Sequence, residues 1–154
     1  GGASFMQKGF LGTYDATIDD KGRVRLPVKF RNMLGEGFVV TQGTENCLCV
    51  YPQEAWEALT ADVLKLGSLD PEVTKFRRSL FANAVEGDFD AAGRVLLPIR
   101  LRTYAGLKKE VTVIGNFDCF EIWDSEAWEK NDVSSAEARA KLQAAVAAKE
   151  ERLG

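Results

Sequence analysis

The sequence predicts an α+β protein, mainly β-strands with flanking helices, in which one structural unit occurs twice. Three observations support this: an internal repeat, short β-rich runs bounded by turn residues in each copy, and helical stretches after each copy. The repeat is the strongest of them. Asp19 to Pro27 matches Asp90 to Pro98 at an offset of 71 residues, and after one inserted residue Glu54 to Trp56 matches Glu126 to Trp128.

Each copy opens with an extended segment and a tight turn. The extended segments cover residues 12–18 and 84–89, and each leads into the pattern Asp-x-x-Gly-Arg. Glycine in such a turn suits a backbone with positive φ, and aspartate can hydrogen-bond to its own turn. The predicted turn-forming residues are therefore Asp19, Gly22, Asp90 and Gly93.

A second strand follows each turn and ends at a proline, which lacks the backbone N–H that a central strand needs. These strands are expected over residues 23–26 and 94–97, and short helices follow over residues 28–34 and 99–105. Two further strands complete each copy, over residues 37–41 and 47–51 in the first and over residues 111–114 and 119–123 in the second.

Helices join and extend the two copies. Residues 52–67 have an amphipathic pattern, and a second linker helix is expected after Asp70 as its N-cap, with Phe76 and Leu80 facing inward. The predicted organisation is an expression-tag remnant and N-terminus (1–8), a first repeat (9–56), a helical linker (57–80), a second repeat (81–128) and a C-terminal helix (129–154), in which Ser134 has capping-box spacing to Glu137.

Composition narrows the possible functions. The chain has no histidine, a formal net charge of -3, and three cysteines without a Cys-x-x-Cys pair. The missing histidine disfavours most catalytic triads and zinc enzymes, and the odd cysteine count fits a reducing cytosol. No apolar run is long enough to span a bilayer. We therefore expect a cytoplasmic protein with no membrane segment, catalytic residue, metal, cofactor or small-molecule substrate.

The cysteines are interpreted as core residues. Cys47 and Cys49 share one face of a predicted strand, and Cys119 occupies the position matching Cys47 in the second copy. A Cys-x-Cys pair without histidine is more often core packing than a metal site.

A basic run after the first turn is the strongest functional signal. Lys21, Arg23 and Arg25 alternate along the chain, so in a regular strand they project from one face, and Lys29 and Arg31 follow. Cations on one face beside a glycine turn can contact phosphates, and arginine can also pair with guanine edges. The alternative interpretation is a hairpin with its own ion pair between the turn aspartate and Arg23.

The second copy retains less of this basic face. Ala92 replaces the lysine and Leu96 replaces the second arginine, so only Arg94 remains. The second turn is therefore expected to help shape the DNA-contacting surface more than to add free energy of DNA binding.

Three runs of residues resemble the MraZ family of bacterial transcriptional regulators. The resemblance rests on Phe10 to Tyr14, on the motif from Asp19 to Pro27 and on its echo from Asp90 to Pro98, and it covers nearly the whole chain. It implies a tandem swapped-hairpin fold of the SpoVT-AbrB type, forming a barrel from two internal repeats within one chain.

The resemblance also implies a function and residue roles. It implies a homo-oligomeric ring, associated with the nucleoid, that binds direct repeats in double-stranded promoter DNA upstream of its own operon and represses the division and cell-wall gene cluster. Arg23 and Arg94 match the arginines of the family's DNA-binding motif, Lys21 matches the basic residue inside the first motif, and Asp19 and Asp90 match its acidic turn position.

Two other functions stay open. A module of the same fold could bind another protein through its turns and acidic surface, without specific DNA binding. A hydrolase could use the carboxylates near the turns, although their spacing supports neither a pocket nor a metal site. These carboxylates are Asp15, Asp19, Asp20, Glu86, Asp88 and Asp90.

Overall fold

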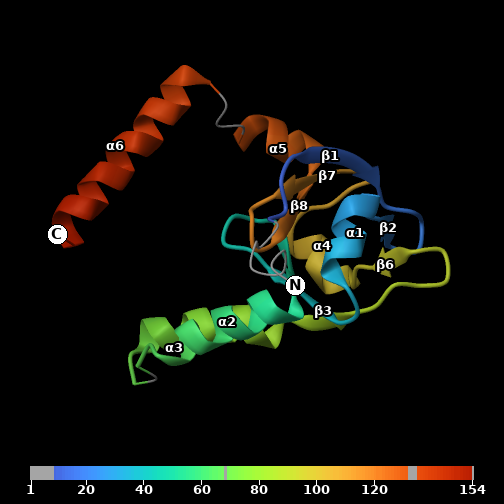
Figure 1. Ribbon diagram of the computed structural model, residues 1–154, viewed down its shortest axis with the longest axis horizontal. Coiled ribbons are helices and arrows are strands. Elements are labelled where there is room, and N and C mark those ends of the chain that lie inside the picture. Colours follow the sequence, from blue (N-terminus) through green and yellow to red (C-terminus); the bar gives the residue numbers. More distant parts are fainter. Residues whose placement is uncertain (1–8, 68, 132–134, 154) are drawn as a thin grey trace, which may run out of the picture.

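The computed structural model describes residues 9–67, 69–131 and 135–153, and shows a mixed α+β fold with antiparallel strand pairing (Figure 1). The elements of the first half are β1 (Thr13–Thr17), β2 (Arg23–Arg25), α1 (Val28–Leu34), β3 (Phe38–Gln42), β4 (Leu48–Pro52), α2 (Gln53–Leu64) and α3 (Pro71–Ala82). Those of the second half are β5 (Val85–Gly87), β6 (Arg94–Leu96), α4 (Ile99–Tyr104), β7 (Glu110–Gly115), β8 (Phe120–Asp124), α5 (Ser125–Asn131) and α6 (Ala136–Leu153).

The two repeats interlock within one six-stranded sheet. Its strand order is β1-β7-β8-β4-β3-β5, so the first strand of each repeat pairs with a strand of the other repeat. The strands β4 and β8 join the two halves at the centre of the sheet. Because each repeat supplies a strand to the other, neither completes its sheet alone.

The strands β2 and β6 form a separate two-stranded ribbon. Single bridges from Ile18 to Val24 and from Phe89 to Val95 connect this ribbon to the segments that follow β1 and β5. The ladders of the described strands do not form a continuous closed barrel. The expectation of a barrel is therefore not met, whereas the expectation of two interleaved repeats agrees with the strand pairing.

The core lies between the sheet, the ribbon and the short helices α1 and α4. Val24 and Val95 form the inner face of the ribbon and are buried. The fully buried ring of Phe30 on α1 contacts Phe10 and Phe120, with centroid separations of 5.2 and 5.1 Å. This packing holds one face of the ribbon against the protein and leaves the other face toward solvent.

The linker helices match their predicted positions, with one error in side-chain direction. The Asp70 carboxylate caps α3 by accepting a hydrogen bond from the Glu72 N–H at 2.9 Å, as expected. Leu80 is buried, but Phe76, which was expected to face inward, is 42% exposed. The physical reason is a cavity between the two helices and the sheet, which Phe76 borders and which leaves its ring partly uncovered.

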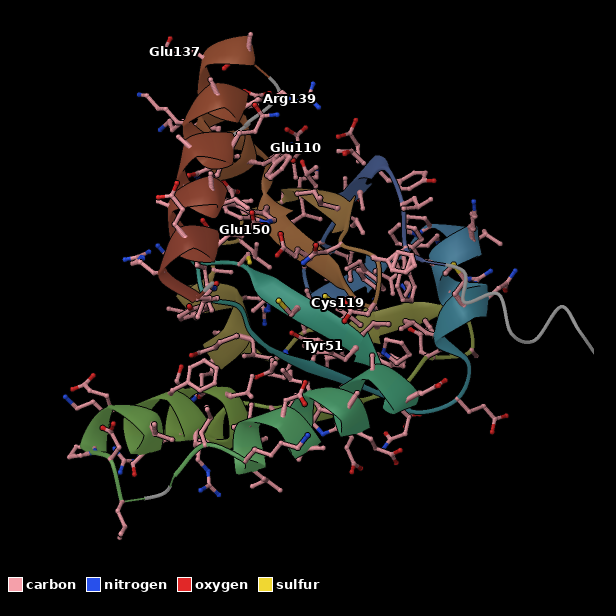
Figure 2. All side chains as sticks on the ribbon, turned by 60° about the vertical axis from the view of Figure 1, so that its left-hand side comes forward. Tyr51, Glu110, Cys119, Glu137, Arg139 and Glu150 are labelled. Carbon is pink, nitrogen blue, oxygen red and sulfur yellow. The ribbon has the colours of Figure 1, made fainter. Side chains whose placement is uncertain are left out.

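The C-terminal helix α6 extends away from the sheet and carries no buried residue (Figures 1 and 2). Ser134, expected to cap it, lies outside the described residues, as does the expected tag remnant at 1–8. The Ser135 hydroxyl instead accepts a hydrogen bond from the Ala138 N–H at 3.2 Å. Across the described parts of the chain, every helix is too short or too polar to span a bilayer.

Candidate nucleic-acid interface

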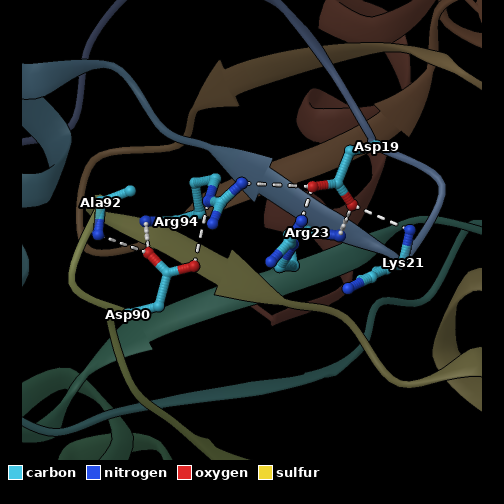
Figure 3. A network of polar contacts seen from close by, with 6 residues as sticks. All are labelled: Asp19, Lys21, Arg23, Asp90, Ala92 and Arg94. Atoms are coloured by element: carbon cyan, nitrogen blue, oxygen red, sulfur yellow. Dashed lines mark hydrogen bonds and ion pairs between the residues drawn. The ribbon is translucent and has the colours of Figure 1, made fainter.

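The first turn is built around the Asp19 side chain. Its Oδ1 atom accepts hydrogen bonds from the backbone N–H groups of Lys21 at 3.0 Å and Arg23 at 2.9 Å, as Figure 3 shows. The Gly22 N–H donates to the Asp19 carbonyl at 3.0 Å. Gly22 has a φ of +87°, which a residue with a Cβ rarely adopts. The turn residues predicted from the sequence therefore form one turn in the first copy.

The second turn repeats these contacts. Asp90 Oδ1 accepts from the N–H groups of Ala92 and Arg94, both at 2.9 Å, and the Gly93 N–H donates to the Asp90 carbonyl. Since the bond at Ala92 uses only the backbone, the loss of a lysine side chain there leaves the turn geometry unchanged.

Each turn aspartate also pairs with its own arginine. Arg23 Nε lies 2.7 Å from Asp19 Oδ2, and Arg94 Nε lies 3.0 Å from Asp90 Oδ2. Arg94 Nη1 also lies 3.5 Å from Asp19 Oδ2, which connects the two copies (Figure 3). The ion pair between Asp19 and Arg23, which the alternative interpretation of a self-paired hairpin predicted, is thus present. Together with the pairs of Arg94, it holds the two arginine side chains near each other.

The ribbon places cations from both repeats on one face. Arg25 lies directly opposite Arg94, and Arg23 lies opposite Leu96. All four alternate with the buried valines and so face away from the core. Lys21 is exposed in the turn before the strand begins. We define the outer ribbon face as the five residues Lys21, Arg23, Arg25, Arg94 and Leu96.

The outer ribbon face contains cations that are not neutralised within the chain. In the part of the chain that the structure describes, neither Lys21 nor Arg25 forms an ion pair. Both side chains are exposed. They are therefore available to an anionic partner, whereas Arg23 and Arg94 share their charge with aspartates.

Sequence reasoning placed Arg31 in the basic run and gave Arg102 no role, so it missed that both arginines support the turns. The Arg102 guanidinium packs on Gly22, where an added Cβ would lie 2.8 Å from it, and Arg31 packs in the same way on Gly93. Arg102 Nε also donates to the Leu97 carbonyl at 2.8 Å. The signal was available, because Arg31 and Arg102 match in the repeat alignment. Each repeat thus inserts an arginine against the turn of the other.

The hydrogen bonds of the turns lower the pKa of both aspartates. Backbone donation from Arg23 is the largest cause at Asp19, and backbone donation from Arg94 is the largest at Asp90. A lowered pKa in the folded state means that the stabilisation is complete above the ordinary value of 3.8 and is lost as pH falls below it.

We expect the melting temperature to fall as pH decreases below 3.8, and Asp19→Asn to flatten this dependence while lowering the melting temperature at pH 7. Melting curves from circular dichroism between pH 2 and 7 would measure both effects. Asp62→Asn is the matched control, because that carboxylate is exposed on α2 and lies 3.8 Å from the exposed Lys65 amine. Identical acid profiles for wild type and Asp19→Asn would contradict the expectation.

The carboxylates considered for a hydrolase have structural partners or lie apart. Asp19 and Asp90 hold the two turns, and Asp15 lies on β1 opposite Thr112 of β7. Within residues 9–67, 69–131 and 135–153, no three of these carboxylates come close enough together to hold a metal ion.

Comparison with known proteins shows which family the chain belongs to. A family profile described as "MraZ protein, putative antitoxin-like" matches twice, over residues 10–79 and 80–151. Among curated proteins, one from Leuconostoc citreum is 43% identical over 128 residues, which is 83% of this chain and 90% of the relative. One from Rhodococcus opacus is 47% identical over 120 residues, covering 78% of this chain and 84% of the relative.

A protein from Acetivibrio thermocellus is 46% identical over 120 residues, covering 78% of this chain and 84% of the relative. All three relatives are named "Transcriptional regulator MraZ". The double profile match and the long alignments cover both repeats, and the chain belongs to the MraZ family.

Proposed function

We propose that the chain is a sequence-specific DNA-binding transcriptional regulator that contacts DNA through the outer ribbon face. The observation that carries the proposal is the placement of Arg25 opposite Arg94 on the ribbon, whose first turn also presents the exposed Lys21. The names of the relatives support the same function.

A two-stranded β-ribbon has dimensions that the major groove admits, and arginine can pair with guanine there. In the proposed complex, Arg25 contacts DNA as a free cation and Lys21 contacts a phosphate. Arg23 and Arg94 are held in fixed directions by their aspartates, so little side-chain freedom is lost when they bind.

The number of subunits is part of the proposal. One chain has a net charge of -3, and its outer ribbon face presents few cations to DNA. Each phosphate contact adds only modest, salt-dependent affinity. We infer a homo-oligomeric ring whose subunits present repeated ribbons to direct repeats in promoter DNA. Joining subunits raises the effective concentration of the second and later contacts.

The remaining proposals follow from the family. They comprise repression of the chain's own operon and of the division and cell-wall gene cluster, and a cytoplasmic, nucleoid-associated location. The proposed mechanism requires no cofactor.

Fluorescence anisotropy at near-physiological salt tests the function. The two labelled duplexes are DNA from just upstream of the protein's own gene and a scrambled sequence of equal composition. Tight binding to the upstream duplex alone is the expected result. If neither duplex binds, or both bind equally, the proposed sequence-specific function is wrong.

The second candidate is a protein-interaction module of the same fold. It is favoured by the pairing of Arg23 and Arg94 with aspartates, which reduces the charge offered to DNA, and by the antitoxin-like description of the family. Absence of binding to either duplex, with the chain folded, would favour this candidate.

A further inference from the structure

All three cysteines gather at the junction between the two repeats. The adjacent strands β4 and β8 place Cys49 directly opposite Glu121. The Cys47 and Cys49 sulfurs and a Glu121 carboxylate oxygen lie within 4.8 Å of one another. The Cys119 thiol lies beside the Cys49 thiol. We call these four residues the thiol cluster.

The thiol cluster has the same symmetry as the repeats. Cys47 and Cys119 occupy equivalent positions, and so do Cys49 and Glu121, at an offset of 72 residues. Each repeat therefore contributes two side chains, spaced two residues apart, to one face of the central strand pair. Three potential ligand atoms therefore lie within reach of one ion, on Cys47, Cys49 and Glu121, and Cys119 adjoins this group through its contact with Cys49.

The chemistry of the cluster differs from that of an ordinary core. The three thiols are buried and form no disulfide. Contact with Cys119 lowers the pKa of Cys49, but contact with Cys47 and burial outweigh it and raise that pKa to about 12. A bound cation would supply the positive charge that makes thiolates favourable at this buried place.

Glu121 is the unusual member of the cluster. Its carboxylate is half-buried beside the thiols and, among the residues that the structure describes, it takes part in no ion pair. Glu121 Oε1 accepts a hydrogen bond from Trp123 Nε1 at 2.9 Å. A hydrogen bond of this kind orients a ligating carboxylate toward its metal. The bond from Trp123 would therefore hold the Glu121 carboxylate in a direction suited to binding an ion.

The cluster also has space and access. A cavity of about 380 Å³ between the sheet and the helices α2 and α3 is lined by Cys49, Tyr51 and Glu121. Figure 2 shows Cys119 and Tyr51 on the same part of the sheet. Gly43 borders both the cavity and the thiols, because an added Cβ would lie 2.6 Å from the Cys47 sulfur. An ion can therefore reach the cluster from solvent through this cavity.

We propose that Cys47, Cys49 and Glu121 form a binding site for one thiophilic divalent cation of the zinc class, and that the Cys119 thiol, which adjoins Cys49, closes on the ion as the fourth ligand. Three thiolates and one carboxylate make up the four-coordinate ligand set that Zn²⁺ accepts. On binding, each thiol releases its proton to solvent as its sulfur bonds the metal, and nothing is oxidised or reduced. The ion would fasten β4 to β8 and so the first repeat to the second. This inference revises the expectation that the cysteines are core residues alone, and it does not depend on the proposed function.

The test titrates Co²⁺ into the reduced, metal-free, full-length chain and follows the absorption spectrum. We expect one ion per chain, with sulfur-to-cobalt charge-transfer bands and the strong visible bands of a tetrahedral site, and displacement by Zn²⁺. Cys49→Ser is expected to lower the affinity at least a hundredfold and Glu121→Gln about tenfold. Glu36→Gln, which changes an exposed carboxylate, is the matched control and should bind as wild type does.

A second measurement needs no variant. One equivalent of Zn²⁺ should protect all three thiols of the wild-type chain from alkylation, as mass spectrometry would show. The proposal is overturned if the folded wild type gives no tetrahedral cobalt spectrum, if zinc leaves the alkylation rate unchanged, or if a folded chain with alanine at all three cysteines binds equally well.

Discussion

Arg25→Ala is expected to weaken binding to the upstream duplex by at least about fivefold, because each lost arginine contact costs roughly 1–3 kcal/mol. The loss should grow with the number of subunits on the DNA, since each ring would lose the same contact several times. The salt dependence should also become shallower, by about one unit of slope for each phosphate contact removed. Anisotropy titrations at several salt concentrations measure both quantities.

Arg25 is a sharper probe than Arg23. Arg25 is exposed and has no ion pair in the described part of the chain, so its removal leaves the turn intact and should change stability by less than about 0.5 kcal/mol. Arg23→Ala should weaken DNA binding as well, but it also leaves the Asp19 carboxylate without its closest partner. Its effect therefore combines a lost contact with a less neutralised Asp19 carboxylate, which keeps only Arg94 at 3.5 Å as an ion-pair partner in the described part of the chain.

The matched control is Arg139→Ala. Arg139 is an exposed arginine on α6, which lies on the opposite side of the molecule from β2 and β6 (Figure 1). The Arg139→Ala substitution changes the net charge by the same amount as Arg25→Ala. Equal loss of affinity in the two variants would show that net charge, and not the outer ribbon face, governs binding.

Phe30→Ala is expected to destabilise the fold by roughly 3–5 kcal/mol, the usual cost of removing a buried phenyl ring. Phe30 is fully buried and contacts the rings of Phe10, Tyr14 and Phe120. Its removal leaves a cavity under α1, where the ribbon packs on the sheet. Urea unfolding followed by circular dichroism measures the change.

Phe30→Leu is the control, since it retains most of the apolar volume and should cost clearly less. A Phe30→Ala variant that unfolds at the wild-type urea concentration would mean that the ring is not part of the stabilising core. DNA binding of Phe30→Ala should recover at low temperature if the ribbon face itself is intact.

Most elements of the fold could be predicted from local signals. The short helix expected over residues 28–34 is α1, and the N-cap at Asp70 was placed correctly. Such features depend on a proline, a turn glycine or a capping side chain a few residues away, so their physical cause lies within the segment itself. The inward direction assigned to Phe76 was wrong because a cavity between separate elements decides its exposure.

The DNA-binding role of Lys21, Arg23, Arg25 and Arg94 stays a prediction, but their arrangement shows what the sequence could not supply. The repeat identified the two turns and their aspartates, since identical local motifs form identical local hydrogen bonds. Strand pairing between residues far apart in the chain decided that Arg94 faces Arg25 and that its guanidinium reaches Asp19.

By itself, the sequence determined that the protein consists of two related units with polar turns, strands and linking helices. Only the tertiary structure decided which strands of the two units pair, that both units contribute cations to one ribbon, and that Cys49 lies opposite Glu121. The physical reason is that secondary structure and turns follow from nearby residues, whereas strand partners are selected by burial of the whole core. Equivalent residues of the two repeats meet because the chain folds onto its own second copy.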